Sequence, residues 1–194
     1  KETDFVAVES LNPDLIIIGG SQAEDIDSFK ETAPTVNLAV DGQDYMNSFK
    51  TVVTDLGNLF DKQDEAKKAI DEIEAKIAKV NKTVTEKGLT ASVVMANEGS
   101  ISAFSAKSRY GLIYNGLGFT EADKNIDDST HGQQVSFEYF LENKSDYVFV
   151  VDRGAVTGKG EAASKLFDNE VMNKTEVSSR IVAMSFCEPR SCAF

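Results

Sequence analysis

The apolar positions between residues 62 and 87 recur at steps of three and four, which is the period of one face of an α-helix. The members of this stripe are Ala66, Ile70, Ile73, Ile77, Val80 and Val84. No Gly or Pro interrupts the segment before Gly88, so the pattern predicts one helix of roughly 40 Å at 1.5 Å per residue. Because the stripe covers only about three heptads, we interpret it as a connecting helix between two lobes rather than a coiled coil.

Helix and strand patterns alternate on both sides of this segment. Before it, we predict helices over 4–11, 23–32 and 43–60 and strands over 15–18 and 35–40; after it, strands over 90–96, 101–104, 146–151 and 180–184 and helices over 108–117, 136–143 and 161–172. Short, continuously apolar runs such as 15–18 are typical of parallel strands buried on both faces. The predicted fold is therefore α/β, with an N-lobe over 1–61, the connecting helix over 62–87 and a C-lobe over 88–194 that have mainly parallel sheets.

The chain is strongly acidic, with a net charge of −12 over 194 residues and a pI of about 4.5. Such a surface repels phosphate backbones, which argues against nucleic acid as a partner. No apolar run reaches the length of a membrane helix. Cys187 and Cys192 lie near the C-terminus, where they either form a disulfide or remain as thiols.

Positive side chains stand out against this acidic background because they lie in loops after predicted strands. In an α/β fold such loops line the ligand cleft, here expected between the two lobes. The C-lobe loops contain Lys107, Arg109, Arg153 and the only histidine, His131, with Phe104 and Tyr110 as candidate aromatic walls; the N-lobe loop offers Ser21 after a Gly pair.

Each candidate residue can also be interpreted as having no role in binding. Arg109 follows Ser108, the predicted N-cap of a helix, and a cation there opposes the helix dipole unless it meets an anion. The alternative is a solvated loop arginine. Arg153 is equally compatible with an ion pair to a carboxylate, His131 and Lys107 with plain surface positions, and the two aromatic residues with the core.

Signatures of common enzymes are missing from the sequence. It contains no Gly-x-Ser-x-Gly elbow, no Walker loop and no complete dinucleotide fingerprint. With one histidine and two cysteines near the end of the chain, a resident zinc site is not expected. The residues therefore favour a binding protein, not an enzyme, with no intrinsic cofactor.

Four motifs resemble a known family. They are LNPDLIII at 11–18, SAF to SRYG between 102 and 111, THGQ at 130–133 and VVDRG at 150–154. Together they resemble the substrate-binding lipoproteins of iron–siderophore ABC transporters, and in particular the catecholate-siderophore group. Members of this class III periplasmic-binding-protein-like family have two α/β lobes joined by one long helix.

The resemblance implies capture of a ferric siderophore and its delivery to a membrane permease. It assigns Arg109 and Arg153 to the ligand's negatively charged oxygens and His131 to iron when the siderophore leaves a coordination position open. It also implies a monomer outside the cytoplasm, either a lipoprotein anchored to the cell membrane or a periplasmic protein. Haem, another iron chelate or a corrinoid is the alternative ligand, and an α/β enzyme subunit or a simple interaction module is the alternative class.

The chain departs from the family pattern at three places. Ser21 stands where the family often has an arginine, which removes one positive contact. The family normally has further strands before Lys1, so the N-lobe is expected to be incomplete. After Met184, residues 185–194 replace a segment that carries a tyrosine iron ligand in the family, and no residue here inherits that role.

Overall fold

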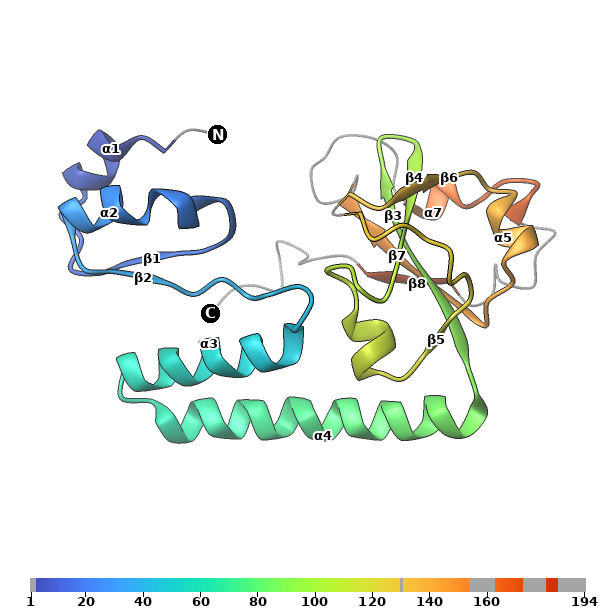
Figure 1. The fold of residues 1–194 in the computed structure, drawn as a ribbon, viewed down its shortest axis with the longest axis horizontal. Coiled ribbons are helices and arrows are strands. Elements are labelled where there is room, and N and C mark those ends of the chain that lie inside the picture. The colour runs from blue at the N-terminus through green and yellow to red at the C-terminus, as the bar shows by residue number, and fades with distance from the viewer. Residues whose placement is uncertain (1–2, 130, 154–162, 173–180, 185–194) are drawn as a thin grey trace. The chain divides into compact units, whose positions relative to one another are not determined.

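The computed structural model describes residues 3–129, 131–153, 163–172 and 181–184. The chain divides into two compact units, Lys1–Glu72 and Ile73–Phe194, and the division falls inside the long helix. Figure 1 labels the elements of both units along the chain. Within the described residues, no helix combines the length and the apolar character that crossing a membrane requires.

The first unit is built around a small parallel sheet. Its elements are α1 (Phe5–Ser10), β1 (Ile16–Ile18), the 3-10 helix η1 (Gly20–Asp25), α2 (Ile26–Thr32), β2 (Thr35–Asn37) and α3 (Tyr45–Leu59). β1 pairs in parallel with β2, and Ile16, Ile18 and Phe29 form the centre of the core. Ile17 is 47% exposed, so the expectation that this strand is buried on both faces is wrong within this unit.

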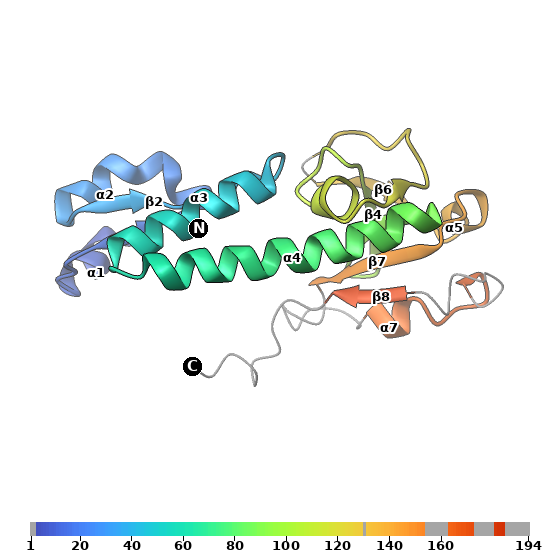
Figure 2. The same cartoon turned by 90° about the horizontal axis from the view of Figure 1, so that it is seen from below.

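The predicted connecting helix is confirmed as α4 (Gln63–Lys87), which Figure 2 shows as one unbroken helix. Asp64 and Glu65 lie in its first turn and Lys87 in its last. These charges complement the helix dipole, which is positive at the N-terminus and negative at the C-terminus. Gly57 of α3 allows close packing, because a Cβ there would lie 2.6 Å from the Cβ of Ala66.

The inward stripe of α4 differs from the predicted one at a single position. Val80 is 41% exposed, whereas its neighbour Asn81 is partly buried and donates a hydrogen bond from Nδ2 to the carbonyl of Gly116 at 2.9 Å. Steps of three and four from Ile77 reach either residue, so periodicity alone does not decide between them. In the structure Asn81 takes the inner position, and its amide binds the segment Leu112–Gly116 to the helix.

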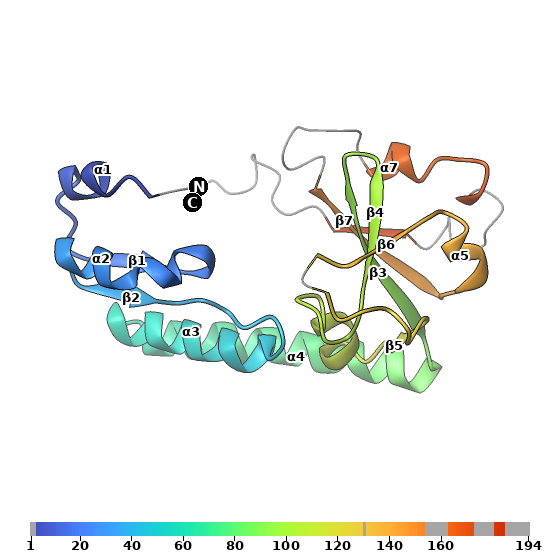
Figure 3. The ribbon, with the colours of Figure 1, turned by 45° about the horizontal axis from the view of Figure 1, so that its top comes forward.

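The second unit contains a six-stranded mixed sheet in the order β6-β4-β3-β7-β8, with β5 beside β3. Its elements are β3 (Thr90–Asn97), β4 (Ser100–Phe104), the π-helix η2 (Leu112–Gly116), β5 (Thr120–Glu121), β6 (Gln133–Val135), α5 (Tyr139–Glu142), β7 (Tyr147–Asp152), α7 (Ala163–Leu166) and β8 (Ile181–Met184). Figure 3 shows β3, β4 and β7 at the centre of this unit. The β3–β5, β3–β7 and β7–β8 pairs are parallel, and the β3–β4 and β4–β6 pairs are antiparallel.

Alternate residues of the central strands enter two different apolar clusters. Val94, Val148 and Val150 pack with residues of α5 and α7 on one face. Val93 and Phe149 pack on the other face with Val84 of α4 and with residues of η2. This period of two is what a strand buried on both faces produces. The strands predicted over 90–96, 101–104, 146–151 and 180–184 are therefore confirmed with small shifts of their ends.

The region after β4 differs most from its prediction. The helix expected over 108–117 is a single π-helical segment that begins at Leu112. The hydroxyl of Ser108 donates to the carbonyl of Ser105 at 2.7 Å and accepts from the backbone N–H of Tyr110 at 3.2 Å. Since this hydroxyl is used within a turn, it does not cap a helix. The dipole argument for Arg109 is therefore wrong, because the residue precedes the helix.

Two short strands lie in a stretch that showed no strand pattern. β5 pairs with the start of β3, and β6 pairs with β4 at Ala103 and Gln133. The predicted helices in this half are shorter than expected, since α5 covers Tyr139–Glu142 and α7 covers Ala163–Leu166. The early part of the helix predicted over 161–172, together with Cys187 and Cys192, lies outside the described residues.

Gly118 provides a test of how tightly the η2 region is held to α4. Its φ is +83°, and a Cβ would lie 2.8 Å from Nδ2 of Asn81 and 2.9 Å from Oγ1 of Thr85. We expect Gly118→Ala to lower the free energy of unfolding by about 2–3 kcal/mol, because the left-handed backbone costs roughly 1–2 kcal/mol and displacing the Asn81 amide costs about 1 more.

Gly99 is the matched control for this substitution. It has nearly the same φ, +82°, but nothing within 4 Å of its Cβ position. Urea unfolding followed by tyrosine fluorescence compares the two alanine variants, since four of the five tyrosines lie in the second unit. Equal losses for Gly99→Ala and Gly118→Ala would show that contact with α4 adds nothing beyond backbone strain.

Candidate functional site

The loop that leaves β4 is fixed by two carboxylates that are distant in sequence. Glu121 Oε1 accepts the backbone N–H of Ala106 at 2.7 Å, and Asp128 Oδ1 accepts the Ser105 hydroxyl at 2.7 Å. Asp128 also binds Lys107 Nζ at 2.9 Å through its other oxygen. The hydrogen bond from Lys107 holds the pKa of Asp128 below its usual range, and the reciprocal interaction raises the pKa of Lys107. Lys107 is thus engaged in holding the loop.

Tyr114 joins the π-helix that follows this loop to the central sheet. Its hydroxyl accepts from the N–H of Val93 at 3.0 Å and donates to the carbonyl of Phe104 at 3.3 Å. Val93 and Phe104 are partners in the β3–β4 ladder. Burial raises the pKa of Tyr114 far above its ordinary value, so this hydroxyl stays protonated and keeps both hydrogen bonds at neutral pH. The loop therefore has a fixed anchor at each end.

Arg109 lies over two aromatic rings at the start of this anchored segment. Its Cζ is 5.7 Å from the ring centroid of Phe104 and 5.6 Å from that of Tyr110. The two rings meet edge to face at 4.8 Å and 86°. Phe104 is buried, Tyr110 is half-buried and Arg109 is exposed. Cation–π attraction within about 6 Å restrains the guanidinium, so the positive charge sits on an aromatic platform at the protein surface.

Arg153 follows β7, the strand that pairs in parallel with β3. Burial raises the pKa of Tyr110, and the positive charges of Arg109 and Arg153 both act against that rise. Both guanidinium groups are therefore close enough to Tyr110 to influence its hydroxyl. Asp152, directly before Arg153, is buried and accepts the backbone N–H of Ala163 at 2.7 Å. Arg109 thus lies over the Tyr110 ring, and the charge of Arg153 also acts on the pKa of Tyr110.

His131 lies near Phe104, because the residue that follows it, Gly132, packs against the Phe104 ring. Gly132 has φ +77°, and a Cβ there would lie 2.8 Å from both the carbonyl oxygen of Ala103 and Cζ of Phe104. The chain therefore runs directly against the Phe104 ring, while the His131 side chain is exposed. In the described part of the chain, no group of three or more His, Cys, Asp or Glu side chains is arranged to hold a metal ion.

The last predicted site residue, Ser21, belongs to the first unit. It lies in η1, is exposed, and its hydroxyl donates to Oε1 of Gln22 at 3.3 Å. Its participation in a site with the arginines stays a prediction. Sequence reasoning missed Glu121, Asp128 and Tyr114, which shape the loop around Arg109. Only Tyr114 left a signal, as a large polar aromatic inside an apolar stretch.

This mixed sheet with its long helix and its arginine platform is typical of a solute-binding protein. The periplasmic binding protein family model matches residues 1–184. The chain therefore belongs to the periplasmic binding protein family, and both the predicted fold class and the resemblance drawn from the four motifs are confirmed.

Individual relatives narrow the comparison to proteins named for siderophores. The chain is 45% identical over 170 residues to the petrobactin-binding protein YclQ of Bacillus subtilis, a match that covers 88% of this chain and 54% of that protein. It is 33% identical over 174 residues to the ferric-anguibactin-binding protein FatB of Vibrio anguillarum, covering 87% and 54% respectively. The chain thus spans about half the length of the curated relatives it matches.

Solved structures agree with this placement. The crystal structure of YclQ superposes with a TM-score of 0.87 at 41% identity, covering 95% of this chain and 65% of that one. The catecholate-siderophore binding protein VctP of Vibrio cholerae gives a TM-score of 0.86 at 28% identity, covering 94% and 67%. The family and these relatives are substrate-binding proteins.

Proposed function

We propose that this chain is part of the solute-binding component of an iron-uptake ABC transporter and that it binds a ferric siderophore of the catecholate type. The observation that carries the proposal is the Arg109 guanidinium above Phe104 and Tyr110, with the charge of Arg153 acting on the same tyrosine. In a chain of net charge −12, a cation held on an aromatic platform suits an anionic ligand.

The chemistry of a ferric tris-catecholate suits this arrangement. The complex is a strongly anionic body with flat aromatic faces. Guanidinium groups provide positive charge, hydrogen-bond donors and a planar surface for stacking, whereas lysine provides only a point charge. The names of the relatives YclQ, FatB and VctP support a siderophore as the ligand, and VctP supports the catecholate class.

Family membership supports the remaining parts of the proposal. His131, exposed beside the platform, is the candidate iron ligand where the siderophore leaves a coordination position open. Ser21 is a candidate contact from the first unit, and Lys107 lies at the edge of the site in its ion pair with Asp128. The permease of the transporter is the expected partner. We place the protein outside the cytoplasm as a monomer, either anchored to the membrane as a lipoprotein or free in a periplasm.

A titration of the intact chain with a synthetic ferric tris-catecholate tests the proposal. The chain has five tyrosines and no tryptophan, and Tyr110 lies within the candidate site, so tyrosine fluorescence reports binding directly. We expect saturable quenching with a dissociation constant of about a micromolar or below, equivalent to roughly 8 kcal/mol. Free tyrosine amide at equal absorbance corrects for light absorbed by the ligand.

Other iron compounds provide the comparison. Haem and a corrinoid are titrated in the same way, and the absorbance spectrum of the purified protein shows whether either is already bound. The iron-free catecholate tests whether ferric charge and shape are required. Saturable binding of haem or of the corrinoid without binding of the ferric catecholate would replace this proposal by the alternative ligand class.

A further inference from the structure

Both backbone groups of Ala106 are held by side chains that come from later elements of the chain. Its N–H donates to Oε1 of Glu121 at 2.7 Å, and its carbonyl accepts from Nδ2 of Asn115 at 2.9 Å. A Cβ at Gly111 would overlap that carbonyl oxygen, so the contact is also closely packed. Ala106 is therefore fixed at its N–H and at its carbonyl, three residues before Arg109.

Glu121 is itself anchored to the central sheet. It is the last residue of β5, and the N–H groups of its neighbours Thr120 and Ala122 donate to the carbonyls of Leu89 and Ala91 at 3.0 Å each. These bonds lie on both sides of Glu121 in the chain. The carboxylate is therefore presented from a rigid element, as a group that fixes the geometry of a binding site requires.

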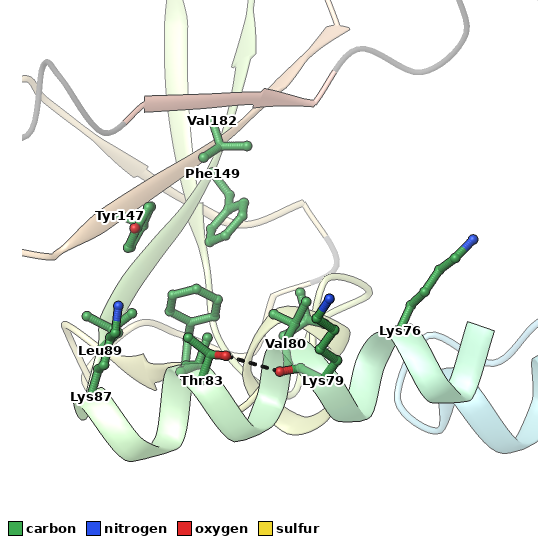
Figure 4. A pocket seen from close by; sticks show the side chains of 12 residues that line it. Lys76, Lys79, Val80, Thr83, Lys87, Leu89, Tyr147, Phe149 and Val182 are labelled. Atoms are coloured by element: carbon green, nitrogen blue, oxygen red, sulfur yellow. Dashed lines mark hydrogen bonds between the residues drawn. The ribbon is translucent and has the colours of Figure 1, made fainter. Parts of the chain in front are cut away.

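The segment between Asn115 and Glu121 is packed onto the same sheet by Phe119. The buried Phe119 ring meets the rings of Tyr147 and Phe149 edge to face, with centroid distances of 5.6 and 5.3 Å respectively. Figure 4 shows Tyr147 and Phe149 on the sheet side of the groove that Phe119 also lines beside α4. Close packing of this kind leaves a segment little freedom to shift. Both residues that hold Ala106 thus have fixed positions relative to β7.

Hydrogen bonds inside the turn connect the position of Ala106 with that of Arg109. The N–H and the hydroxyl of Ser108 donate to the carbonyl of Ser105 at 3.1 and 2.7 Å. The N–H of Tyr110 donates to the Ser108 hydroxyl at 3.2 Å. Both residues that flank Arg109 are therefore bonded within the turn. The guanidinium reaches the aromatic platform from a backbone that is already ordered.

We propose that Glu121 and Asn115 are positioning residues for Arg109. By holding both backbone groups of Ala106, they keep the guanidinium over the aromatic platform before an anionic ligand arrives. A loop that is ordered in advance loses less backbone entropy on binding, which strengthens binding. The effect on siderophore affinity rests on the proposed function, whereas the effect on the position of Arg109 needs no ligand.

The charge of Glu121 makes a positioning role and a purely electrostatic role opposite in sign. A carboxylate repels an anionic ligand, so its removal would strengthen binding if charge alone mattered. We expect Glu121→Ala to weaken binding of a ferric tris-catecholate by about tenfold instead, because one residue of the loop must then be ordered on binding. Glu121→Gln loses the charge but keeps an oxygen that accepts the Ala106 N–H, so it should lose no more than about threefold.

Asn115→Ala tests the other half of the arrangement without changing the charge. It removes the amide that donates to the Ala106 carbonyl, and we expect binding to weaken by about threefold or more. Glu142→Ala is the matched control for Glu121→Ala, since Glu142 is exposed in α5 and the substitution removes the same charge. Its affinity should stay within about twofold of the parent. Equilibrium dialysis with radiolabelled iron compares these variants.

A measurement without ligand separates this proposal from the proposed function. Aromatic rings shift the resonances of protons held over them, so the Nε–H resonance of Arg109, assigned through its loss in Arg109→Lys, reports where the guanidinium lies. In Glu121→Ala and Asn115→Ala, we expect this resonance to move toward the value of a free arginine; in Glu121→Gln it should not. If the parent fails to bind the ferric catecholate while the resonance moves in this way, the proposed function is wrong and the positioning role stands.

A double-mutant cycle shows whether Glu121 acts through Arg109. In the Arg109→Ala background, Glu121→Ala should cost less than about twofold, because no guanidinium remains to be positioned. An equal loss in both backgrounds would assign Glu121 to the general stability of the fold. Tighter binding in Glu121→Ala, or an Arg109 resonance that stays in place, would also overturn the proposal. If Glu121→Ala does not fold, the same cycle with Asn115→Ala decides.

Discussion

The double variant Arg109→Ala, Arg153→Ala is expected to lose about 100-fold or more in affinity for a ferric tris-catecholate. Hydrogen bonds to charged groups contribute roughly 1.5–3 kcal/mol each, and 1.4 kcal/mol corresponds to a factor of ten. The positive charges of both guanidinium groups act against the rise in the pKa of Tyr110 that burial causes, and we expect an anion bound beside this residue to interact with both. Each single variant should lose about tenfold. Equilibrium dialysis with radiolabelled iron measures all three affinities.

Two further substitutions distinguish a specific role of the Arg109 guanidinium from a general effect of losing positive charge. Lys107→Ala removes one positive charge from the same loop, but Lys107 is already paired with Asp128 at 2.9 Å. We expect this variant to stay within about threefold of the parent affinity. Arg109→Lys keeps the charge and loses the planar stack over Phe104 and Tyr110, so an intermediate loss is expected.

Several results would contradict this account of the site. Unchanged affinity in the double arginine variant would remove both residues from it. A loss in Lys107→Ala as large as that in Arg109→Ala would show that any nearby positive charge suffices. Thermal unfolding of each variant by circular dichroism provides the check on folding, and the exposed position of Arg109 and Arg153 predicts small changes.

The long helix and the central strands were predictable because packing and local pattern agree there. An uninterrupted helical stripe defines α4, and β3 and β7 are apolar on both faces because alternate residues enter two separate apolar clusters. Val80 was the exception. The helical period allowed either Val80 or Asn81 on the inner face, and a hydrogen bond to Gly116, 35 positions away in sequence, decided for Asn81. No local signal contains that contact.

The candidate site was predictable only in part, because contacts between residues distant in sequence also shape it. Arg109, Tyr110 and Phe104 are close in sequence, whereas Arg153 follows Asp152, whose partner Ala96 lies three positions along β3 from Val93, the partner of Phe104. The loop conformation depends instead on two carboxylates that are distant in sequence. Glu121 accepts the backbone N–H of Ala106, 15 positions earlier, and Asp128 accepts the hydroxyl of Ser105, 23 positions earlier. β5 and β6 are too short to show a strand period, since they exist through pairing with β3 and β4.

Phe104 connects the stability of the second unit with its candidate site. Its side chain is only 2% exposed, packs edge to face on Tyr110 and lies against the chain at Gly132. Removing a ring from such a position leaves a cavity that the backbone around Gly132 fills poorly. We expect Phe104→Ala to lower the free energy of unfolding by about 3–5 kcal/mol and Phe104→Leu to lower it by less.

Urea unfolding followed by tyrosine fluorescence measures this loss, with Leu141→Ala as the control. Leu141 is 42% exposed in the same unit, so its truncation should cost no more than about 1 kcal/mol. Phe104→Leu is expected to remain folded but to bind the ferric catecholate more weakly, because Arg109 loses part of its aromatic support. Equal destabilisation by Phe104→Ala and Leu141→Ala would show that the Phe104 ring does not hold the loop, and the platform under Arg109 would then need another support.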